Sequence, residues 1–425
     1  MRAMKDSGFE WIGEIPVSWE LYKGKYMFTQ RNLRGNNIEL QLLSPTQKYG
    51  VVPQSVYEEL SGMNAVKLNE NTNLSALKTI HKGDFCISLR SFQGGFEYSE
   101  YEGVVSPAYQ VFYPVVKVAR GYYKYLFKEY GFIEKMNSYT MTLRDGKNIA
   151  FADFGNTYIP CPPTTEQQCI ADYLDVRCAE IDALAPDIQA QIDTLEQYKR
   201  SVITETVTKG LNPDAEMKDS GIQWVGAIPS HWPVHPVYSY FGERKNKNCL
   251  GKEDNLLSLS YGRVIRKDIN TNDGLLPESF NTYNIAEAGD IIIRPTDLQN
   301  DKRSLRTGLV KEHGIITSAY IDLYPLRQVD SRYFHFLLHA YDVMKVFYNM
   351  GNGVRQGLNY SEFSRLMVFE PPYDEQVAMA DYLDAKVTEV DAIIEQKKEQ
   401  LAVLDAYKRS LIFEYVTGKK EVPSA

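Results

Sequence analysis

The feature that most constrains this chain is an internal repeat of one sequence plan. The segment Met4–Trp19 returns at Met217–Trp232 with the same Lys-Asp-Ser-Gly start, Ile-Pro pair and two tryptophans. Further along, a Pro-Pro-x-x-Glu-Gln segment begins at Pro162 and again at Pro371, and Tyr-Lys-Arg-Ser follows in both copies. The residues between these anchors match only sparsely. Such a repeat predicts two copies of one fold, and the divergent middles indicate two different ligands, with plain drift after duplication as the alternative.

Two long helices are predicted, one at the end of each copy. From Glu166 to Lys209, apolar or small residues recur every three or four positions, and the second copy keeps this register 209 residues later. At roughly 1.5 Å per residue each helix would be about 60 to 65 Å long, and Pro186 is the point where the first could kink. We expect an antiparallel pair in which Leu174–Leu195 faces Leu383–Leu404. The expected seam residues are Leu174, Ile181, Ile188, Ile192, Leu195, Leu383, Val390, Ile394, Leu401 and Leu404.

The divergent middles are predicted to be mixed α/β globules. They contain short β-prone runs bounded by Gly, Pro or Asp, and two helical stretches, Tyr122–Tyr130 and Arg332–Tyr348. The expected strands are Phe85–Leu89, Ala108–Tyr113, Asp290–Ile293 and Ala319–Tyr324. We therefore predict an α+β protein in which two similar globular domains are separated by two long antiparallel helices. The expected divisions are residues 1–160 (first domain), 161–213 (central helical region), 214–370 (second domain) and 371–425 (C-terminal helical region).

The charge of the chain is segregated along this plan. The formal net charge is −8, but residues 29–160 hold 14 basic against 12 acidic residues and residues 241–370 hold 17 against 16. The helical regions are acidic, with 4 basic against 9 acidic residues in 161–213 and 7 against 11 in 371–425. Because binding of DNA needs local positive charge, the middles are the candidate DNA readers.

Several other classes of protein are disfavoured. The apolar runs are too short for a membrane span, and Asp6 and Glu10 occupy positions where a signal peptide would be apolar, so we expect a cytoplasmic protein. The cysteines lack CxxC or Cys/His ligand spacing, which argues against disulfides and zinc. His335 and His339 have helical spacing but no intervening glutamate, so we interpret them as packing residues. The five cysteines are Cys86, Cys161, Cys169, Cys178 and Cys249.

Catalytic signatures are weak, which predicts a non-catalytic chain. Glu370–Tyr373 is similar to the Asn/Asp-Pro-Pro-Tyr motif of amine methyltransferases, but the first copy has Cys161–Thr164 at this position, where the repeat expects a helix start. The glycines Gly351, Gly353 and Gly357 do not lie in a strand-loop-helix unit that would bind a cofactor phosphate. No GxxxxGK[ST] loop for ATP is present.

The repeated anchors resemble those of Type I restriction-modification specificity subunits. The leader at Lys5–Trp19 and Lys218–Trp232 is similar to the segment that opens the target-recognition domains of that family, and the helix starts at Pro162–Gln167 and Pro371–Gln376 are similar to its conserved helical regions. The resemblance covers nearly the whole chain twice. One departure is Glu370 before the second Pro-Pro pair, where the first copy has a cysteine.

The resemblance implies a sequence-specific subunit that binds double-stranded DNA. Each recognition domain would read one half of a bipartite site, and the helices would set the spacing and dock two adenine-N6 methyltransferase subunits. Restriction and translocase subunits are further implied partners, and no membrane is. The resemblance implies no cofactor on this chain, with S-adenosylmethionine, ATP and Mg on the partner subunits. The alternatives are a coiled-coil scaffold, an orphan DNA-binding regulator without restriction activity and, least favoured, a DNA methyltransferase.

Candidate DNA-binding residues are those that can donate to base edges or phosphates. The first group follows the Gly-Asp anchors of the two middles, and a second group precedes the helices. The candidates are Arg90, Ser91, Gln93, Arg144, Lys147, Asn148, Arg294, Thr296, Asp297, Gln299, Arg303, Arg306, Arg355, Gln356 and Asn359. The leader tryptophans Trp11, Trp19, Trp224 and Trp232 are interpreted as anchors of the domain cores, with docking of a methyltransferase as the alternative.

Overall fold

The computed structural model describes residues 2–34, 40–63, 74–87, 95–139, 149–270, 279–296, 298, 305–350 and 357–423. The chain divides into two compact units. Unit 1 comprises Met1–Ile188 with Glu399–Ala425, and unit 2 comprises Gln189–Lys398. Each unit therefore contains one globular body and one part of each of the two long helices, and the units are described separately.

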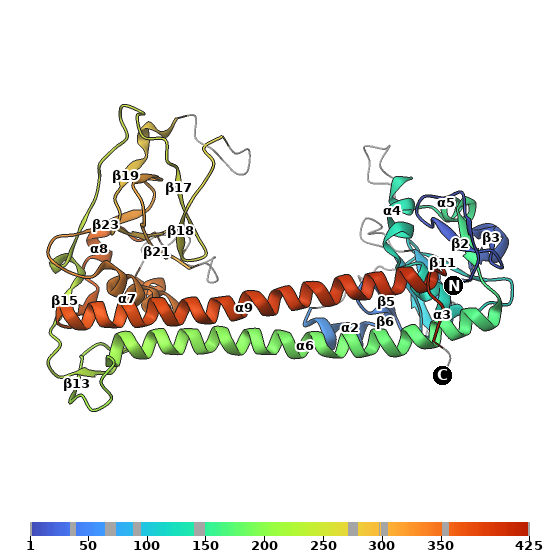
Figure 1. Ribbon diagram of the computed structural model, residues 1–425, viewed down its shortest axis with the longest axis horizontal. Coiled ribbons are helices and arrows are strands. Elements are labelled where there is room, and N and C mark those ends of the chain that lie inside the picture. Colours follow the sequence, from blue (N-terminus) through green and yellow to red (C-terminus); the bar gives the residue numbers. More distant parts are fainter. Residues whose placement is uncertain are drawn as a thin grey trace. The chain divides into compact units, whose positions relative to one another are not determined.

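The two predicted long helices are confirmed. They are α6 (Thr164–Lys209) and α9 (Tyr373–Val416), labelled in Figure 1. Each begins just after a Pro-Pro pair, and acidic side chains in its first turn stabilise the positive end of the helix dipole. α6 continues through Pro186 without a break. Gly210 and Gly418 adopt φ of +76° and +74° shortly after the helices, the left-handed conformation that commonly ends a helix.

Unit 1 has a four-stranded antiparallel sheet of order β4-β11-β8-β9. Short two-stranded pairs and small helices surround this sheet. Its strands are β1 (Met4–Asp6), β2 (Glu14–Pro16), β3 (Glu20–Lys23), β4 (Phe28–Gln30), β5 (Leu43–Thr46), β6 (Gly50–Pro53), β7 (Lys78–Ile80), β8 (Phe85–Ile87), β9 (Phe96–Tyr98), β10 (Gly103–Val105), β11 (Gln110–Pro114) and β12 (Tyr158–Cys161). Its helices are α1 (Gly24–Met27), α2 (Gln54–Ser61), α3 (Arg120–Leu126), α4 (Tyr130–Ser138) and α5 (Phe151–Asn156).

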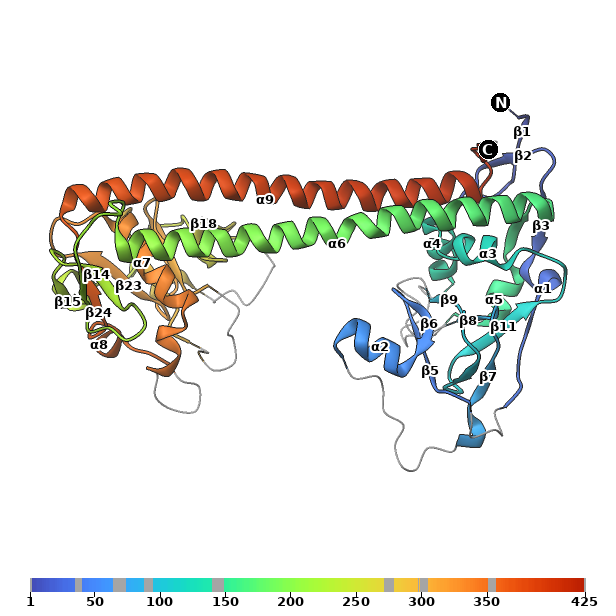
Figure 2. The same cartoon turned by 90° about the horizontal axis from the view of Figure 1, so that it is seen from below.

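Unit 2 repeats this sheet with the order β16-β23-β20-β21, so the α+β prediction is confirmed. Its labelled strands and helices can be followed in Figure 2. The strands are β13 (Met217–Asp219), β14 (Ala227–Pro229), β15 (Val234–Pro236), β16 (Phe241–Glu243), β17 (Leu257–Ser260), β18 (Arg263–Arg266), β19 (Asn284–Ala286), β20 (Ile291–Ile293), β21 (Thr307–Leu309), β22 (Gly314–Ile316), β23 (Ile321–Pro325) and β24 (Met367–Phe369). The helices are α7 (Ser331–Val343) and α8 (Tyr360–Phe363), and a 3-10 turn covers Val346–Asn349.

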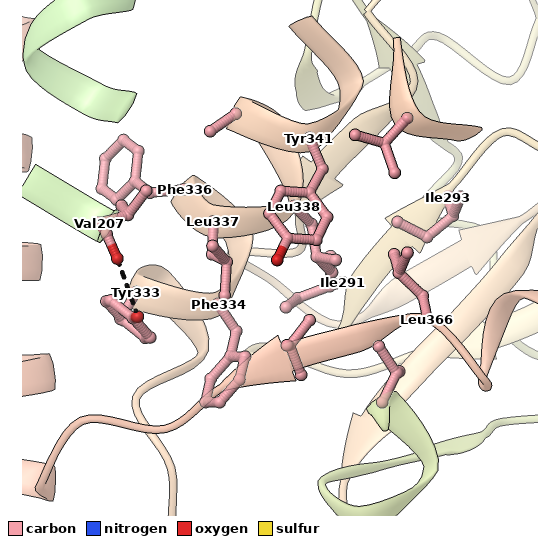
Figure 3. Close-up of a cluster of buried hydrophobic side chains, with 14 of the residues drawn as sticks. Val207, Ile291, Ile293, Tyr333, Phe334, Phe336, Leu337, Leu338, Tyr341 and Leu366 are labelled. Atoms are coloured by element: carbon pink, nitrogen blue, oxygen red, sulfur yellow. Dashed lines mark hydrogen bonds between the residues drawn. The ribbon is translucent and has the colours of Figure 1, made fainter. Parts of the chain in front are cut away.

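The core of each unit lies between its sheet and its long helices. In unit 1, Phe28 makes edge contacts with Phe85, Phe112 and Phe127, so aromatic rings fill the centre. In unit 2, α7 packs its apolar side chains against Ile291, Ile293 and neighbouring residues (Figure 3). Full burial of one such side chain contributes roughly 1.5 to 3 kcal/mol.

Within each unit the two long helices pack antiparallel. In unit 1, Leu174 and Cys178 near the start of α6 share a core with Leu411 and Tyr415 near the end of α9. The Lys408 ammonium bridges Asp182 at 2.6 Å. In unit 2 the roles are exchanged, because the end of α6 meets the start of α9. Ile203 and Val207 share a core with Met379, Ala380 and Leu383, and Lys199 bridges Asp391 at 2.6 Å.

The expected antiparallel pairing is confirmed within each unit, and Leu404 packs against the core that contains Leu174, but the partners are shifted from the expected facing of Leu174–Leu195 with Leu383–Leu404. Antiparallel packing places the start of one helix against the end of the other, so Leu174 shares its core with Leu411, and Leu383 shares its core with Val207. Of the expected seam residues, those that are buried are Leu174, Ile181, Ile192, Leu383, Val390 and Ile394. Those that are not fully buried are Ile188, Leu195, Leu401 and Leu404.

Candidate nucleic-acid interface

Most of the predicted DNA-binding residues lie outside the described part of the chain. They are Arg90, Ser91, Gln93, Arg144, Lys147, Asn148, Asp297, Gln299, Arg303, Arg355 and Gln356. They fall within the undescribed segments that come after β8 and β20 and that precede α5 and α8. Arg294, Thr296, Arg306 and Asn359 are described, and all four belong to unit 2.

Arg306 is placed in the interior of unit 2 rather than on its surface. Its side chain is fully buried, and its guanidinium donates to the backbone carbonyls of Arg294 and Thr296 and to the Tyr348 hydroxyl at 3.1 Å. Its backbone N–H donates to the buried Asp342 carboxylate. These bonds tie residues 294–296 to residue 306, so the Arg306 side chain holds two segments of unit 2 together. Whether Arg306 contacts DNA stays a prediction.

The other described candidates have different surroundings. Arg294 is half-buried and Thr296 is exposed. Asn359 is exposed and caps α8. Its side chain accepts a hydrogen bond of 3.0 Å from the Glu362 N–H, and the Asn359 N–H donates in turn to the Glu362 carboxylate. The structure brings Arg294, Thr296 and Arg306 together through backbone contacts, and Leu358 donates its N–H to the Pro295 carbonyl beside them.

The tryptophan and glutamate of the repeated motifs bond to each other. The Trp19 indole N–H donates to Glu166 at 2.9 Å in unit 1, and the Trp232 indole donates to Glu375 at 2.9 Å in unit 2. Both rings are fully buried, as expected of core anchors. Each leader is thereby held at the start of one long helix. The pairing was missed in the sequence, although the joint recurrence of the two motifs could have indicated it.

The glutamine of each helix start fixes a second element in the same way. The Gln167 side chain accepts from the Ala119 N–H at 2.9 Å, just before α3, and donates to the Pro162 carbonyl. Gln376 accepts from the Asp330 N–H at 2.9 Å, just before α7, and donates to Pro371. Both amides are buried, so each bond satisfies polar groups that burial would otherwise leave unpaired.

A tyrosine joins each body to the end of the other long helix in its unit. The Tyr122 hydroxyl donates to the Val416 carbonyl at 2.6 Å, at the last residue of α9. The Tyr333 hydroxyl donates to the Val207 carbonyl at 3.2 Å, in the last turn of α6 (Figure 3). Burial raises the pKa of both phenols well above 10. Each body therefore holds the start of one helix and the end of the other.

An arginine and aspartate pair supports the strand that precedes the first group of predicted DNA-binding residues in each unit. Arg31 binds Asp84 at 2.6 Å beside β8, and Arg244 binds Asp290 at 2.6 Å beside β20. Both carboxylates are buried. These are the aspartates of the repeated Gly-Asp anchors, so the repeat preserves the ion pair beside the strand in both units.

Neither a metal-binding cluster nor a membrane-spanning helix is found among the described residues. No group of three or more His, Cys, Asp or Glu side chains is arranged to hold a metal ion among them. Within the same ranges no helix is long and apolar enough to cross a bilayer. All five cysteines are free, and Cys86 and Cys178 are buried.

Comparison with known proteins points to one family. Residues 19–194 match the model of the Type I restriction modification DNA specificity domain. The chain is 26% identical over 312 residues to the Type I restriction enzyme MjaVIII specificity subunit of Methanocaldococcus jannaschii, covering 67% of this chain and 68% of the relative. It is 24% identical over 270 residues to the putative type I restriction enzyme MjaX specificity subunit of the same organism, covering 62% of this chain and 59% of that relative.

Two solved structures share the fold. One, from a study of complex assembly and conformational transition of the type I R-M system, aligns with a TM-score of 0.72 at 13% identity over 96% of this chain and 99% of the other. The HsdS subunit from Thermoanaerobacter tengcongensis aligns with a TM-score of 0.54 at 14% identity over 98% of this chain and 100% of the other. The duplicated leaders, the helix starts, the family match and the shared fold lead to one conclusion. Residues 19–194 match the Type I restriction modification DNA specificity domain, and the chain as a whole is similar to type I restriction-modification specificity subunits in sequence and in fold.

Proposed function

We propose that each body of this chain reads one half of a bipartite DNA site. The observation that carries the proposal is the contrast between the two copies. The contacts that hold each body to the helices are the same in both, as the Trp19–Glu166 and Trp232–Glu375 bonds illustrate. The residues predicted to read DNA differ in sequence between the copies. Two bodies that share these contacts but differ in their predicted DNA-binding residues are suited to two different half-sites.

We further propose that α6 and α9 set the spacing between the half-sites. Each helix begins in one unit and ends in the other, so both connections between the bodies are helical. At about 1.5 Å per residue, a helix of 46 residues is about 69 Å long. A stiff connection of fixed length would specify the spacer, much as the geometry of dimeric DNA-binding proteins fixes half-site spacing.

The partners and cofactors in this proposal derive from the family. The chain would dock two adenine-N6 methyltransferase subunits and, in a restriction complex, restriction and translocase subunits. S-adenosylmethionine, ATP and Mg would bind to those partners, while this chain contributes recognition without catalysis. The acidic helical regions are candidate docking surfaces, since they hold an excess of acidic residues and contain none of the predicted DNA-binding residues.

An exchange of one body tests the assignment of half-sites. The complex of this chain with its methyltransferase is expressed with residues 29–160 replaced by those of a relative, and methylated sites are mapped by methylome sequencing. One half-site should change while the other stays. Exchange of residues 241–370 is the matched control and should change the opposite half. A change in both halves, or in neither, would contradict the assignment, and methylation by the purified chain alone would contradict its non-catalytic role.

An insertion tests the role of the helices. Four residues added near Ala190 lengthen α6 by about 6 Å and rotate the remainder of this helix by roughly 40°. The half-sites should persist while the spacer changes by a base pair or two, or methylation should be lost because α9 cannot adjust to the longer α6. An unchanged spacer with unchanged activity would show that partner contacts, and not the helices, position the bodies.

A further inference from the structure

The hairpin β17–β18 of unit 2 ends in a strained and fully exposed tyrosine. Tyr261 and Gly262 are the two residues between the strands, and both have positive φ, +47° and +77°. Two central residues of this kind define the type I′ turn, in which Asn-Gly is the favoured pair. A bulky aromatic residue at the first position is disfavoured because its Cβ crowds the backbone.

Nothing in the described part of unit 2 compensates for this strain. The Tyr261 side chain is 92% exposed, so it gains almost no burial. It makes no hydrogen bond or ring contact with any residue that the structure describes. A strained residue that does not stabilise its own fold is a candidate for contact with a ligand.

The hairpin holds this tip in a fixed place. Leu259 and Val264 pack against the small core of Leu257 and Ile292. Gly308 on β21 makes room for them, since a Cβ there would lie 2.5 Å from Leu259. At the tip, a Cβ on Gly262 would lie 2.9 Å from Leu305, so the turn is in close contact with the chain before β21.

The long helices hold the outer edge of the same hairpin. Arg263, the second residue after Tyr261, binds the Asp391 carboxylate of α9, and Lys199 of α6 binds the same carboxylate at 2.6 Å. β18 accordingly lies beside α9 in both views (Figure 1; Figure 2). The tip is thus attached to the helix pair of unit 2 as well as to the sheet.

The hairpin is basic, which identifies the kind of ligand. Residues 257–267 contain Arg263, Arg266 and Lys267 and no acidic residue. Arg266 is exposed, and Arg263 is 70% exposed at its side chain despite its bond to Asp391. An exposed aromatic ring on the same hairpin as exposed cations suits DNA, because the cations bind phosphates while the ring can make apolar contacts with base edges in a groove.

We propose that Tyr261 is a DNA contact of the second body, with its ring packed against base edges in a groove of one half-site and Arg266 on a phosphate of the same half-site. The proposal rests on the DNA-reading function proposed above and assigns it to a residue outside both predicted groups. The corresponding hairpin β5–β6 of unit 1 differs. There the Tyr49 hydroxyl donates to the Leu60 carbonyl at 3.2 Å, and its ring lies under Lys48, so this tyrosine is engaged within its own unit.

The test compares Tyr261→Asn with the unaltered chain, both assembled with the methyltransferase. Binding is measured by fluorescence anisotropy on a duplex that carries the motif found by methylome sequencing. Asn suits the type I′ turn, so the thermal stability of the chain should be equal or higher. DNA binding should weaken between about 5-fold and about 100-fold, the range for loss of one good contact to a base edge. Tyr261→Phe keeps the ring and should bind like the unaltered chain.

A control and three outcomes make the test decisive. Tyr238→Asn removes another exposed tyrosine of unit 2, which is 56% exposed, and should leave binding unchanged. Equal affinity of Tyr261→Asn and the unaltered complex would overturn the assignment of Tyr261 while leaving the proposed function intact. Loss of assembly with the methyltransferase, instead of loss of DNA binding, would also overturn it, because the tip would then be a protein contact. Failure of the unaltered complex to bind any duplex would refute the proposed function itself.

Discussion

Units 1 and 2 share one sheet order, and each buries a carboxylate next to an equivalent strand, β8 in unit 1 and β20 in unit 2. The carboxylate lies on opposite sides of that strand in the two units. In unit 1, Cys86 on β8 lies between Glu97 on β9 and a valine on β11. In unit 2, Ile292 on β20 lies between a glycine on β21 and Asp322 on β23. The acidic side chain therefore occupies opposite sides of the strand in the two copies.

The two carboxylates also have different surroundings. Burial raises the pKa of Glu97 to about 7, although the Lys128 ammonium at 2.7 Å opposes this. Burial raises the pKa of Asp322 to about 8, and the neighbouring Asp290 charge raises it further while Arg244 opposes it. The two copies share the arginine and aspartate pair of each frame but not the buried charges around it. Each unit should consequently respond to pH and to loss of its arginine in its own way.

The largest expected effect is loss of the arginine from unit 2. Arg244→Met leaves Asp290 without its partner beside a second buried carboxylate, and breaking a buried ion pair costs about 3 to 5 kcal/mol. Arg31→Met leaves only Asp84 and should cost less. Hydrogen exchange of the amides of β20 and β8 measures the two local stabilities. Equal loss of protection in the two variants would show that Asp322 does not add to the destabilisation caused by removing Arg244.

A smaller effect is expected from pH. Because the folded pKa of Asp322 lies above its ordinary value of 3.8, the folded unit keeps a proton that the unfolded chain has lost, and the stability of unit 2 should fall as pH rises from about 4 to about 8. The slope is on the order of 1 kcal/mol per pH unit. Asp322→Asn should remove this slope and raise stability at pH 8. Urea unfolding at pH 5.5 and pH 8.5, monitored by tryptophan fluorescence, measures it.

Glu97→Gln is the matched variant in unit 1. The pKa of Glu97 is raised from its ordinary value of 4.5 to about 7, so Glu97 should lower the stability of unit 1 as pH rises between these two values. Glu97→Gln should therefore remove the pH dependence of stability over a narrower range than Asp322→Asn does. If both variants remove the pH dependence of stability over the same pH range, the two buried carboxylates do not make the units respond differently to pH.

The smallest effect is expected at the anchors that the units share. Trp19→Phe and Trp232→Phe each remove one indole hydrogen bond, which contributes about 1 kcal/mol. The two losses should be similar, because Glu166 keeps Arg2 and Glu375 keeps His231 as partners. Thermal unfolding of the two variants compares them. A much larger loss at one anchor would mean that the frames are not equivalent.

The repeat and the helices could be predicted from the sequence because they depend on patterns along the chain. Apolar spacing over more than forty residues identifies a helix whatever it packs against, and the two copies support each other. The antiparallel pairing could be predicted as well, but the exact partners along the two helices could not. The register of Leu174 and Leu383 shows equivalent positions in two copies, whereas antiparallel packing joins positions that are not equivalent.

The candidate site was less predictable, because residue type does not determine burial. Arg306 has the chemistry of a base contact, yet its guanidinium binds backbone carbonyls inside unit 2. The role of Tyr261 could not be predicted, because strain at a turn depends on backbone angles that the sequence alone does not specify. The pairing of Trp19 with Glu166 joins residues far apart in the chain, and only its recurrence at Trp232 and Glu375 could have indicated it.

Unit 1 is built from the two ends of the chain, and this has a consequence for folding during synthesis. Its body is made first, but the Tyr122 hydroxyl needs the Val416 carbonyl, and Arg2 and Lys419 bind across the same junction. All of Gln189–Lys398 leaves the ribosome before Glu399–Ala425 does. Unit 2 can therefore complete its fold while unit 1 still exposes the apolar surface around Leu174. We therefore expect the body that is translated first to finish folding last.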